Sequence, residues 1–107
     1  MVIRYTEAFK RQLERLSRRY RGIRADVQPV IDRLAVGETP GDRIPGIGYV
    51  LYKVRVKKSA SARGKRGGFR IIYYLHTGDD ILLVTIYSKS EQADITAEEL
   101  QRMLAGS

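Results

Sequence analysis

The chain has 107 residues, enough for one domain with a single hydrophobic core and too few for two. It has no cysteine, which excludes disulfides, thiolate nucleophiles and thiolate metal sites. Lysine and arginine number 20 against 12 aspartates and glutamates, a formal net charge of +8. Such an excess indicates a polyanionic partner: a nucleic acid, a membrane surface or an acidic protein. The chain shows no apolar run typical of a signal peptide or a membrane span, so we expect a cytoplasmic protein.

The positive charge is concentrated in one segment, residues 53–70. This segment contains eight basic residues and no acidic one, whereas basic and acidic residues are equal in number over the rest of the chain. The eight are Lys53, Arg55, Lys57, Lys58, Arg63, Lys65, Arg66 and Arg70. We therefore expect a focused cationic surface and not an evenly charged molecule.

The first part of the chain is predicted to form a short strand and two helices. Residues 2–5 can form an edge strand, and Thr6 is a suitable N-cap for a helix that ends near Gly22. Apolar residues at helical spacing, with lysine and arginine between them, make this helix amphipathic with a basic outer face. A second helix is expected from about Asp26 to Gly37, where glycine favours a helix stop. The two helices should form a hairpin.

Three longer strands are predicted next. After an irregular segment over residues 37–48, residues 49–57 alternate between apolar and basic side chains, as in a strand with one buried face. Residues 69–75 and 81–87 are almost continuously apolar and are joined by a turn at 77–80. Continuous apolarity is typical of central strands that are covered on both faces.

A short helix is predicted at the end of the chain, because Thr96 and Glu99 have the spacing of a capping box and Leu104 continues an apolar stripe. The predicted order is therefore β-α-α-β-β-β-α. This order indicates an α+β fold, in which an N-terminal helical hairpin packs on a small, mainly antiparallel, curled sheet with a short C-terminal helix. Residues 1–107 are expected to form a single domain.

Three cations alternate along the first long strand. Strand geometry places Lys53, Arg55 and Lys57 on one face, about 6–7 Å apart, which is close to the phosphate repeat of a nucleic-acid strand. Residues 59–68 contain no acidic and no bulky apolar residue, and a basic loop of this kind could wrap a phosphate backbone. An ordinary solvated sheet face and a solubilising loop are the alternative interpretations.

Conventional catalytic sets are missing from the sequence. His76 is the one histidine, so a two-histidine ribonuclease site is excluded, and we expect this residue to be exposed beside a turn. Asp79 and Asp80 fit turn chemistry better than a cation site, and no metal cluster or nucleotide-binding loop is found. Among the aromatic residues, Tyr87 ends a strand and precedes polar residues, so we expect it to be available for stacking on a base.

Three segments in this order resemble the RelE/ParE superfamily of bacterial toxins. They are YKVRV at 52–56, GFRIIYY at 68–74 and TIYSKSE at 85–91. GKRGG at 64–68 and YSK at 87–89 are most similar to the HigB-type branch. The resemblance spans nearly the whole chain.

The resemblance implies the toxin of a type II toxin-antitoxin system that enters the ribosomal A site and cuts messenger RNA during translation. In this family the cut needs no metal: the RNA 2′-hydroxyl attacks the adjacent phosphate and leaves a cyclic phosphate. A cognate antitoxin binds the toxin and blocks it. Neither a cofactor nor a membrane partner is expected.

The resemblance also implies site residues. Lys53, Arg55 and Arg70 match the active-site cations of the family, and Lys89 falls at the cationic position after the last strand. Neighbouring cations favour a neutral lysine, which makes Lys53 the candidate base, while Arg70 can fork onto the phosphate. Lys89 is a better candidate acid than Arg55, because arginine holds its proton too tightly. The residues expected to contact RNA are Lys57, Lys58, Arg63, Lys65, Arg66 and Tyr87.

Two other functions stay open. A ParE-like toxin would inhibit DNA gyrase without catalysis, although that branch tends not to carry so dense a cation set on its central strands. A non-catalytic RNA-binding module would tolerate Lys53→Ala with only a salt-dependent loss of affinity. RelE itself uses a tyrosine in its C-terminal stretch, and the corresponding place here is near Thr96, with Asp94 close by.

Overall fold

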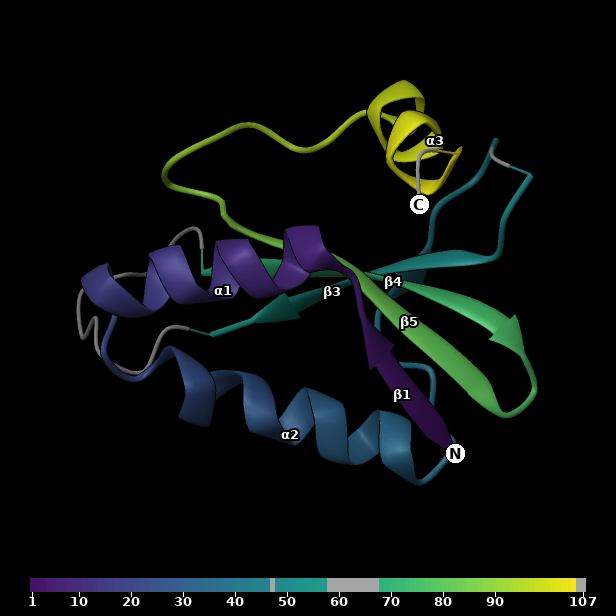
Figure 1. Cartoon of the computed structure of the whole chain (residues 1–107), viewed down its shortest axis with the longest axis horizontal. Helices are drawn as coiled ribbons and strands as arrows, with labels where there is room; N and C mark the ends of the chain where they lie inside the picture. Colours follow the sequence, from purple (N-terminus) through teal and green to yellow (C-terminus); the bar gives the residue numbers. More distant parts are fainter. Residues whose placement is uncertain (47, 58–67, 106–107) are drawn as a thin grey trace.

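The computed structural model describes residues 1–46, 48–57 and 68–105. Its elements are β1 (Val2–Tyr5), α1 (Glu7–Arg19), α2 (Ile23–Ala35), β2 (Asp42–Arg43), β3 (Leu51–Val56), β4 (Phe69–Thr77), β5 (Asp80–Ser88) and α3 (Ala97–Ala105). The strands form one sheet in the order β1-β5-β4-β3-β2, antiparallel except for the parallel pair β1–β5. The α1–α2 hairpin covers one face and α3 lies on the other (Figure 1). This arrangement confirms the predicted α+β fold.

The differences from the sequence prediction lie at the ends of elements and in one short strand. α2 begins at Ile23 and not near Asp26, and β3 begins at Leu51 and not at residue 49. The segment expected to be irregular contains β2, which pairs antiparallel with β3 and places Asp42 opposite Lys53. A strand of two charged residues has no apolar alternation, so the sequence pattern gives no signal for it.

The larger core lies between the helical hairpin and the sheet. Its members include Phe9, Leu16, Ile23, Val27 and Leu34 from the helices and Val54, Val56, Ile71, Tyr73, Leu83 and Ile86 from the strands. Thr6 caps α1 as predicted, since its hydroxyl accepts a hydrogen bond of 2.9 Å from the backbone N–H of Phe9. Because Val54 and Val56 face this core, Lys53 and Arg55 face the opposite side of the sheet.

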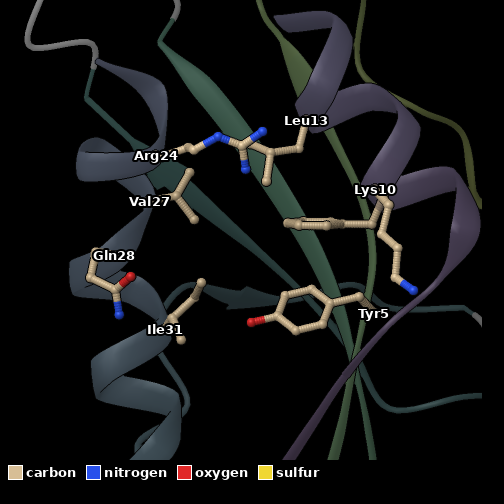
Figure 2. Close-up of a pocket in the computed structure, with 8 residues that line it drawn as sticks. Tyr5, Lys10, Leu13, Arg24, Val27, Gln28 and Ile31 are labelled. Carbon is tan, nitrogen blue, oxygen red and sulfur yellow. The ribbon is translucent and has the colours of Figure 1, made fainter. Parts of the chain in front are cut away.

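A hollow of about 350 Å³ lies between α1 and α2. Figure 2 shows Tyr5 and Leu13 pointing across it toward Val27 and Ile31. The rest of its lining is Phe9, Lys10, Arg24 and Gln28. The hollow is therefore mainly apolar, and it lies on the helical side of the sheet.

No helix in the described ranges is long and apolar enough to cross a membrane.

The second core lies under α3, where Leu100 and Leu104 pack together with Leu51, Ile72 and Val84 of the sheet. The predicted capping box starts this helix. The hydroxyl of Thr96 accepts a hydrogen bond of 3.1 Å from the backbone N–H of Glu99, whose carboxylate accepts one of 3.0 Å from the N–H of Thr96.

β1 is held at the edge of the sheet by an ion pair to the start of β5. Arg4 donates two hydrogen bonds to the carboxylate of Asp80, of 3.0 and 2.8 Å. His76 is exposed beside the turn, as predicted, with Nδ1 3.2 Å from the same carboxylate. The hydrogen bond from Arg4 is the largest cause that lowers the pKa of Asp80, and His76 adds to it.

We expect Asp80→Asn to lower the free energy of unfolding slightly at neutral pH and to have less effect in acid. The pKa of Asp80 is lower in the folded than in the unfolded chain. Its stabilising contribution is therefore complete above the unfolded-state pKa of about 4 and is lost as the pH falls through the folded-state value. Urea unfolding at neutral and acidic pH measures this, with Asp79→Asn in the same turn as the control. A loss that is equal at both pH values would contradict the charge-based explanation.

Candidate functional site

Basic side chains gather around one hollow on the sheet face that carries α3. The register places Arg70 of β4 directly opposite Arg55 of β3. Side chains at directly opposed positions are about 5 Å apart, and like charges there repel each other. Lys53 lies on the same face two residues before Arg55. These three cations and Gly41, Asp42 and Asp94 line a hollow of about 380 Å³.

Asp94 connects three of the predicted site residues. Its Oδ1 accepts a hydrogen bond of 2.9 Å from the Tyr87 hydroxyl, and its Oδ2 lies 3.0 Å from Nζ of Lys89 and 3.7 Å from Nζ of Lys53. The hydrogen bond from Lys89 is the largest cause that lowers the pKa of Asp94, followed by that from Tyr87. Asp94 is therefore ionised at neutral pH, and it holds two lysine side chains at the edge of the arginine pair.

The structure thus adds two carboxylates to a site that the sequence described by its cations. Asp42 reaches the site because β2 pairs with β3, and Asp94 reaches it because the chain turns back after β5. Neither belongs to the basic segment 53–70. Asp94 had one sequence signal, its place near the C-terminal position that assists catalysis in RelE, whereas Asp42 had none.

Residues 7–106 match the sequence model of the family described as the RelE toxin of the RelE/RelB toxin-antitoxin system. The chain belongs to the RelE toxin family. This membership identifies it as a toxin of a toxin-antitoxin system and implies a cognate antitoxin as a partner. The match includes every element from α1 to α3, and with them the whole candidate site. Because the match is to the family as a whole, the narrower HigB-type assignment stays a prediction.

In this RelE toxin, Tyr87 is not placed as expected. Tyr87 is 1% exposed and lies in the core under α3, so no face of its ring is open to a base, and the expectation of stacking is wrong. Its hydroxyl instead reaches the site through Asp94. Burial, with the hydrogen bond to Asp94, raises the pKa of Tyr87 to about 12, so the hydroxyl stays protonated as a donor. Thr96, near the family's tyrosine position, caps α3.

The structure describes only part of the predicted RNA-contacting set. Lys57 is exposed at the end of β3, and with Arg55 it lines a hollow of about 480 Å³ beside the start of α2. Arg55 lines this hollow, which is on the α2 side, as well as the one that holds Arg70, so it is a lining residue of both. The other predicted contacts, Lys58, Arg63, Lys65 and Arg66, lie outside the described residues.

Proposed function

We propose that this RelE-family toxin is a ribosome-dependent endoribonuclease, of the HigB type, that cuts messenger RNA in the ribosomal A site. The observation that carries the proposal is the direct pairing of Arg55 with Arg70 in a hollow that also holds Lys53. Two arginines held opposite each other repel, and an anion between them relieves the repulsion. A phosphate suits this place, because a guanidinium can donate two parallel hydrogen bonds to its oxygens.

The proposed reaction uses the RNA's own 2′-hydroxyl and requires neither a metal nor a cofactor. The 2′-oxygen forms a bond to the adjacent phosphorus, and the bond from phosphorus to the 5′-oxygen breaks, which leaves a cyclic phosphate. The proton of the 2′-hydroxyl passes to a base, and the leaving 5′-oxygen takes a proton from an acid. Arg55 and Arg70 stabilise the negative charge that develops on the phosphate oxygens.

The two lysines at the edge of the arginine pair are the proposed acid and base. Lys89 is the acid, because its Nζ lies 3.0 Å from the Asp94 carboxylate, which holds this proton-donating side chain at the site. Lys53 is the base. It accepts a proton only in its neutral form, so its contact with Asp94 must be released first. At 3.7 Å this contact is longer than the 3.0 Å contact of Lys89, and it is the easier one to release.

The other cations are proposed to hold the RNA on either side of the cut. Lys57 follows Lys53 and Arg55 along β3, and it lines a second hollow that also includes Arg55. Lys58, Arg63, Lys65 and Arg66 keep their predicted role as backbone contacts. Because the proposed substrate is messenger RNA under translation, we infer that the toxin acts in the cytoplasm.

Controlled expression in bacteria, followed by primer extension on several abundant messages, tests the proposal. We expect new 5′ ends within translated frames and none on untranslated RNA. Lys53→Ala should reduce cleavage by about 100-fold or more, the usual contribution of a general base, without a comparable loss of RNA binding. Lys10→Ala, which removes the same charge on the helical side, serves as the control.

Two results would overturn the endoribonuclease proposal. Growth arrest without new RNA ends would indicate DNA gyrase or another protein target. Stable RNA association without cleavage, with Lys53→Ala weakening binding only in a salt-dependent way, would indicate a non-catalytic RNA-binding module.

A further inference from the structure

The segment between β5 and α3 brings two of the candidate site's side chains to the sheet. Lys89 and Asp94 both lie in residues 89–96, which form neither helix nor strand. The placement of this segment sets the contact between Lys89 and Asp94 and the contact between Asp94 and Lys53. The geometry of the proposed acid and base therefore depends on what holds the segment in place.

Backbone hydrogen bonds fix the start of the segment. The N–H of Lys89 donates to the carbonyl of Gly68 at 3.0 Å, which ties the segment to the residue before β4. The N–H groups of Glu91 and Gln92 both donate to the carbonyl of Ser88, at 3.0 and 3.2 Å. These bonds make a tight turn that directs the side chain of Glu91 away from the site and toward α1.

The Glu91 carboxylate is bound by three side chains from the C-terminal end of α1 and its cap. Arg15 lies 3.2 Å from Oε1 and Arg19 lies 3.4 Å from Oε2, and the Tyr20 hydroxyl donates to Oε2 at 3.1 Å. Although both arginines are at least half exposed, the side chain of Glu91 is only 18% exposed. In Figure 1 the connection from β5 to α3 swings out toward this end of α1 before it turns back to α3.

The cluster also reaches the strand that carries Arg70. The ring of Tyr20 packs edge-on against Phe69, with ring centroids 5.2 Å apart, and Phe69 immediately precedes Arg70 in β4. A carboxylate as little exposed as Glu91 depends on its partners, because losing them leaves a charge that water solvates poorly. The cluster of Glu91, Arg15, Arg19 and Tyr20, which we call the clamp, thus connects α1 to β4, which carries Arg70, and to residues 89–96, which include Lys89.

The sign of the charge argues against an RNA-binding role for this clamp. Glu91 is negative, and it neutralises two arginines on a strongly basic protein. If electrostatic attraction alone mattered, replacing Glu91 with a neutral residue would release Arg15 and Arg19 and strengthen RNA binding. A clamp that positions the turn has the opposite consequence for cleavage, because small displacements of catalytic groups slow a reaction strongly.

We propose that Glu91 is a positioning residue: through Arg15, Arg19 and Tyr20 it fixes the turn that presents Lys89 and Asp94 to the reacting RNA. The inference rests on the proposed endoribonuclease function, which it deepens by assigning a role to residues that do not touch the substrate. It links the basic end of α1 to the chemistry on the opposite side of the sheet.

Cleavage kinetics on ribosomes loaded with a defined message test the proposal. We expect Glu91→Gln to lower kcat by about 10- to 100-fold while KM stays the same or falls, because the protein gains positive charge as it loses geometry. Arg19→Ala should also lower kcat. Arg18→Ala is its matched control, since Arg18 is similarly exposed on α1 but pairs with Glu14. Arg19 is 69% exposed, so Arg19→Ala should leave the core intact. This variant therefore tests the proposal even if Glu91→Gln fails to fold.

A second readout needs no cleavage. Titration of the Asp94 carboxyl group by NMR, in the free full-length toxin, should show its pKa rising toward the ordinary value in Glu91→Gln and Arg19→Ala but not in Arg18→Ala. A wild-type toxin that cuts no RNA would refute the proposed function, and the titration would still decide the clamp. Unchanged kcat together with an unchanged Asp94 titration, in a wild type that cleaves, would overturn the role of Glu91.

Discussion

Replacement of Arg70 by alanine should abolish toxicity and leave the fold intact. Arg70 is half-buried on the central strand β4, with Arg55 opposite on one side and Tyr87 opposite on the other. From this position its planar guanidinium can donate two hydrogen bonds to a phosphate and oppose the charge that develops there. Removal of one such preorganised donor group costs a factor of about 100 to 1,000 in rate, and we expect at least the lower figure.

The stability of Arg70→Ala should differ from wild type by less than about 1 kcal/mol, because two effects oppose each other. The substitution removes the repulsion between Arg70 and Arg55, and it also removes the packing of the arginine stem. Urea unfolding measures the stability, and mapping of 5′ ends in cells measures cleavage. Arg70→Lys keeps the charge but not the paired donors, so we expect a cleavage rate between those of wild type and Arg70→Ala.

Arg24→Ala is the matched control for Arg70→Ala. Arg24 is exposed on α2, on the helical side of the sheet, where it pairs with Glu14. Both substitutions change the net charge by the same amount, so a general electrostatic effect on ribosome or RNA binding would appear in both. Normal toxicity from a well-expressed Arg70→Ala variant would remove Arg70 from the active site.

The fold could be predicted from the sequence because its main signals are local. The alternation along residues 49–57 correctly separated Val54 and Val56 from Lys53 and Arg55, since side-chain direction in a strand repeats every second residue. The caps Thr6 and Thr96 were also correct, because a capping side chain bonds to a backbone group three residues later. Such features need no knowledge of the rest of the chain.

The carboxylates of the site could not be predicted in this way, because they arrive through contacts between distant segments. Asp42 lies opposite Lys53 because the short strand β2, which has no apolar pattern, pairs with β3. Asp94 contacts Lys53 although two strands, β4 and β5, lie between them in the sequence. The clamp at Glu91 is of the same kind, since its arginines lie near the beginning of the chain. Charge counts along the chain describe a basic segment, but only the topology shows which acids accompany it.

Tyr87 shows a different reason for a wrong prediction. A strand with strict alternation places Val84 and Tyr87 on opposite faces, yet both lie in the core under α3. The register between β4 and β5 shifts at Ile72 and Tyr73, which indicates a β-bulge, and an extra residue reverses the faces of everything beyond it. The ring of Tyr87 is therefore turned into a core while its hydroxyl reaches Asp94. The prediction failed because the polar residues after β5 indicated an exposed strand end, whereas cores cover both faces of β5; the bulge decides which of the two cores the ring enters.

Gly41→Ala should be the most destabilising change at the rim of the site. Gly41 precedes β2 with a φ of +93°, a conformation that L residues rarely adopt, and an added Cβ would overlap the backbone carbonyl oxygen of Lys53. Strain and overlap together should lower the free energy of unfolding by at least about 2 kcal/mol, which urea denaturation would measure. Because Gly41 lines the hollow, cleavage should fall even under conditions in which the variant stays folded.

Gly46→Ala separates the effect of backbone strain from the effect of steric overlap. Gly46 also has a positive φ, of +78°, but a Cβ there would meet nothing within 4 Å, so the substitution adds strain without overlap. We expect it to cost only about 1 kcal/mol and to leave cleavage unchanged. Equal losses in the two variants would mean that the close approach of Gly41 to β3 has no special importance. A larger loss at Gly41, with slower cleavage, would show that the approach of β2 to Lys53 is part of the active-site structure, because the pairing that brings Asp42 to Lys53 begins immediately after this glycine.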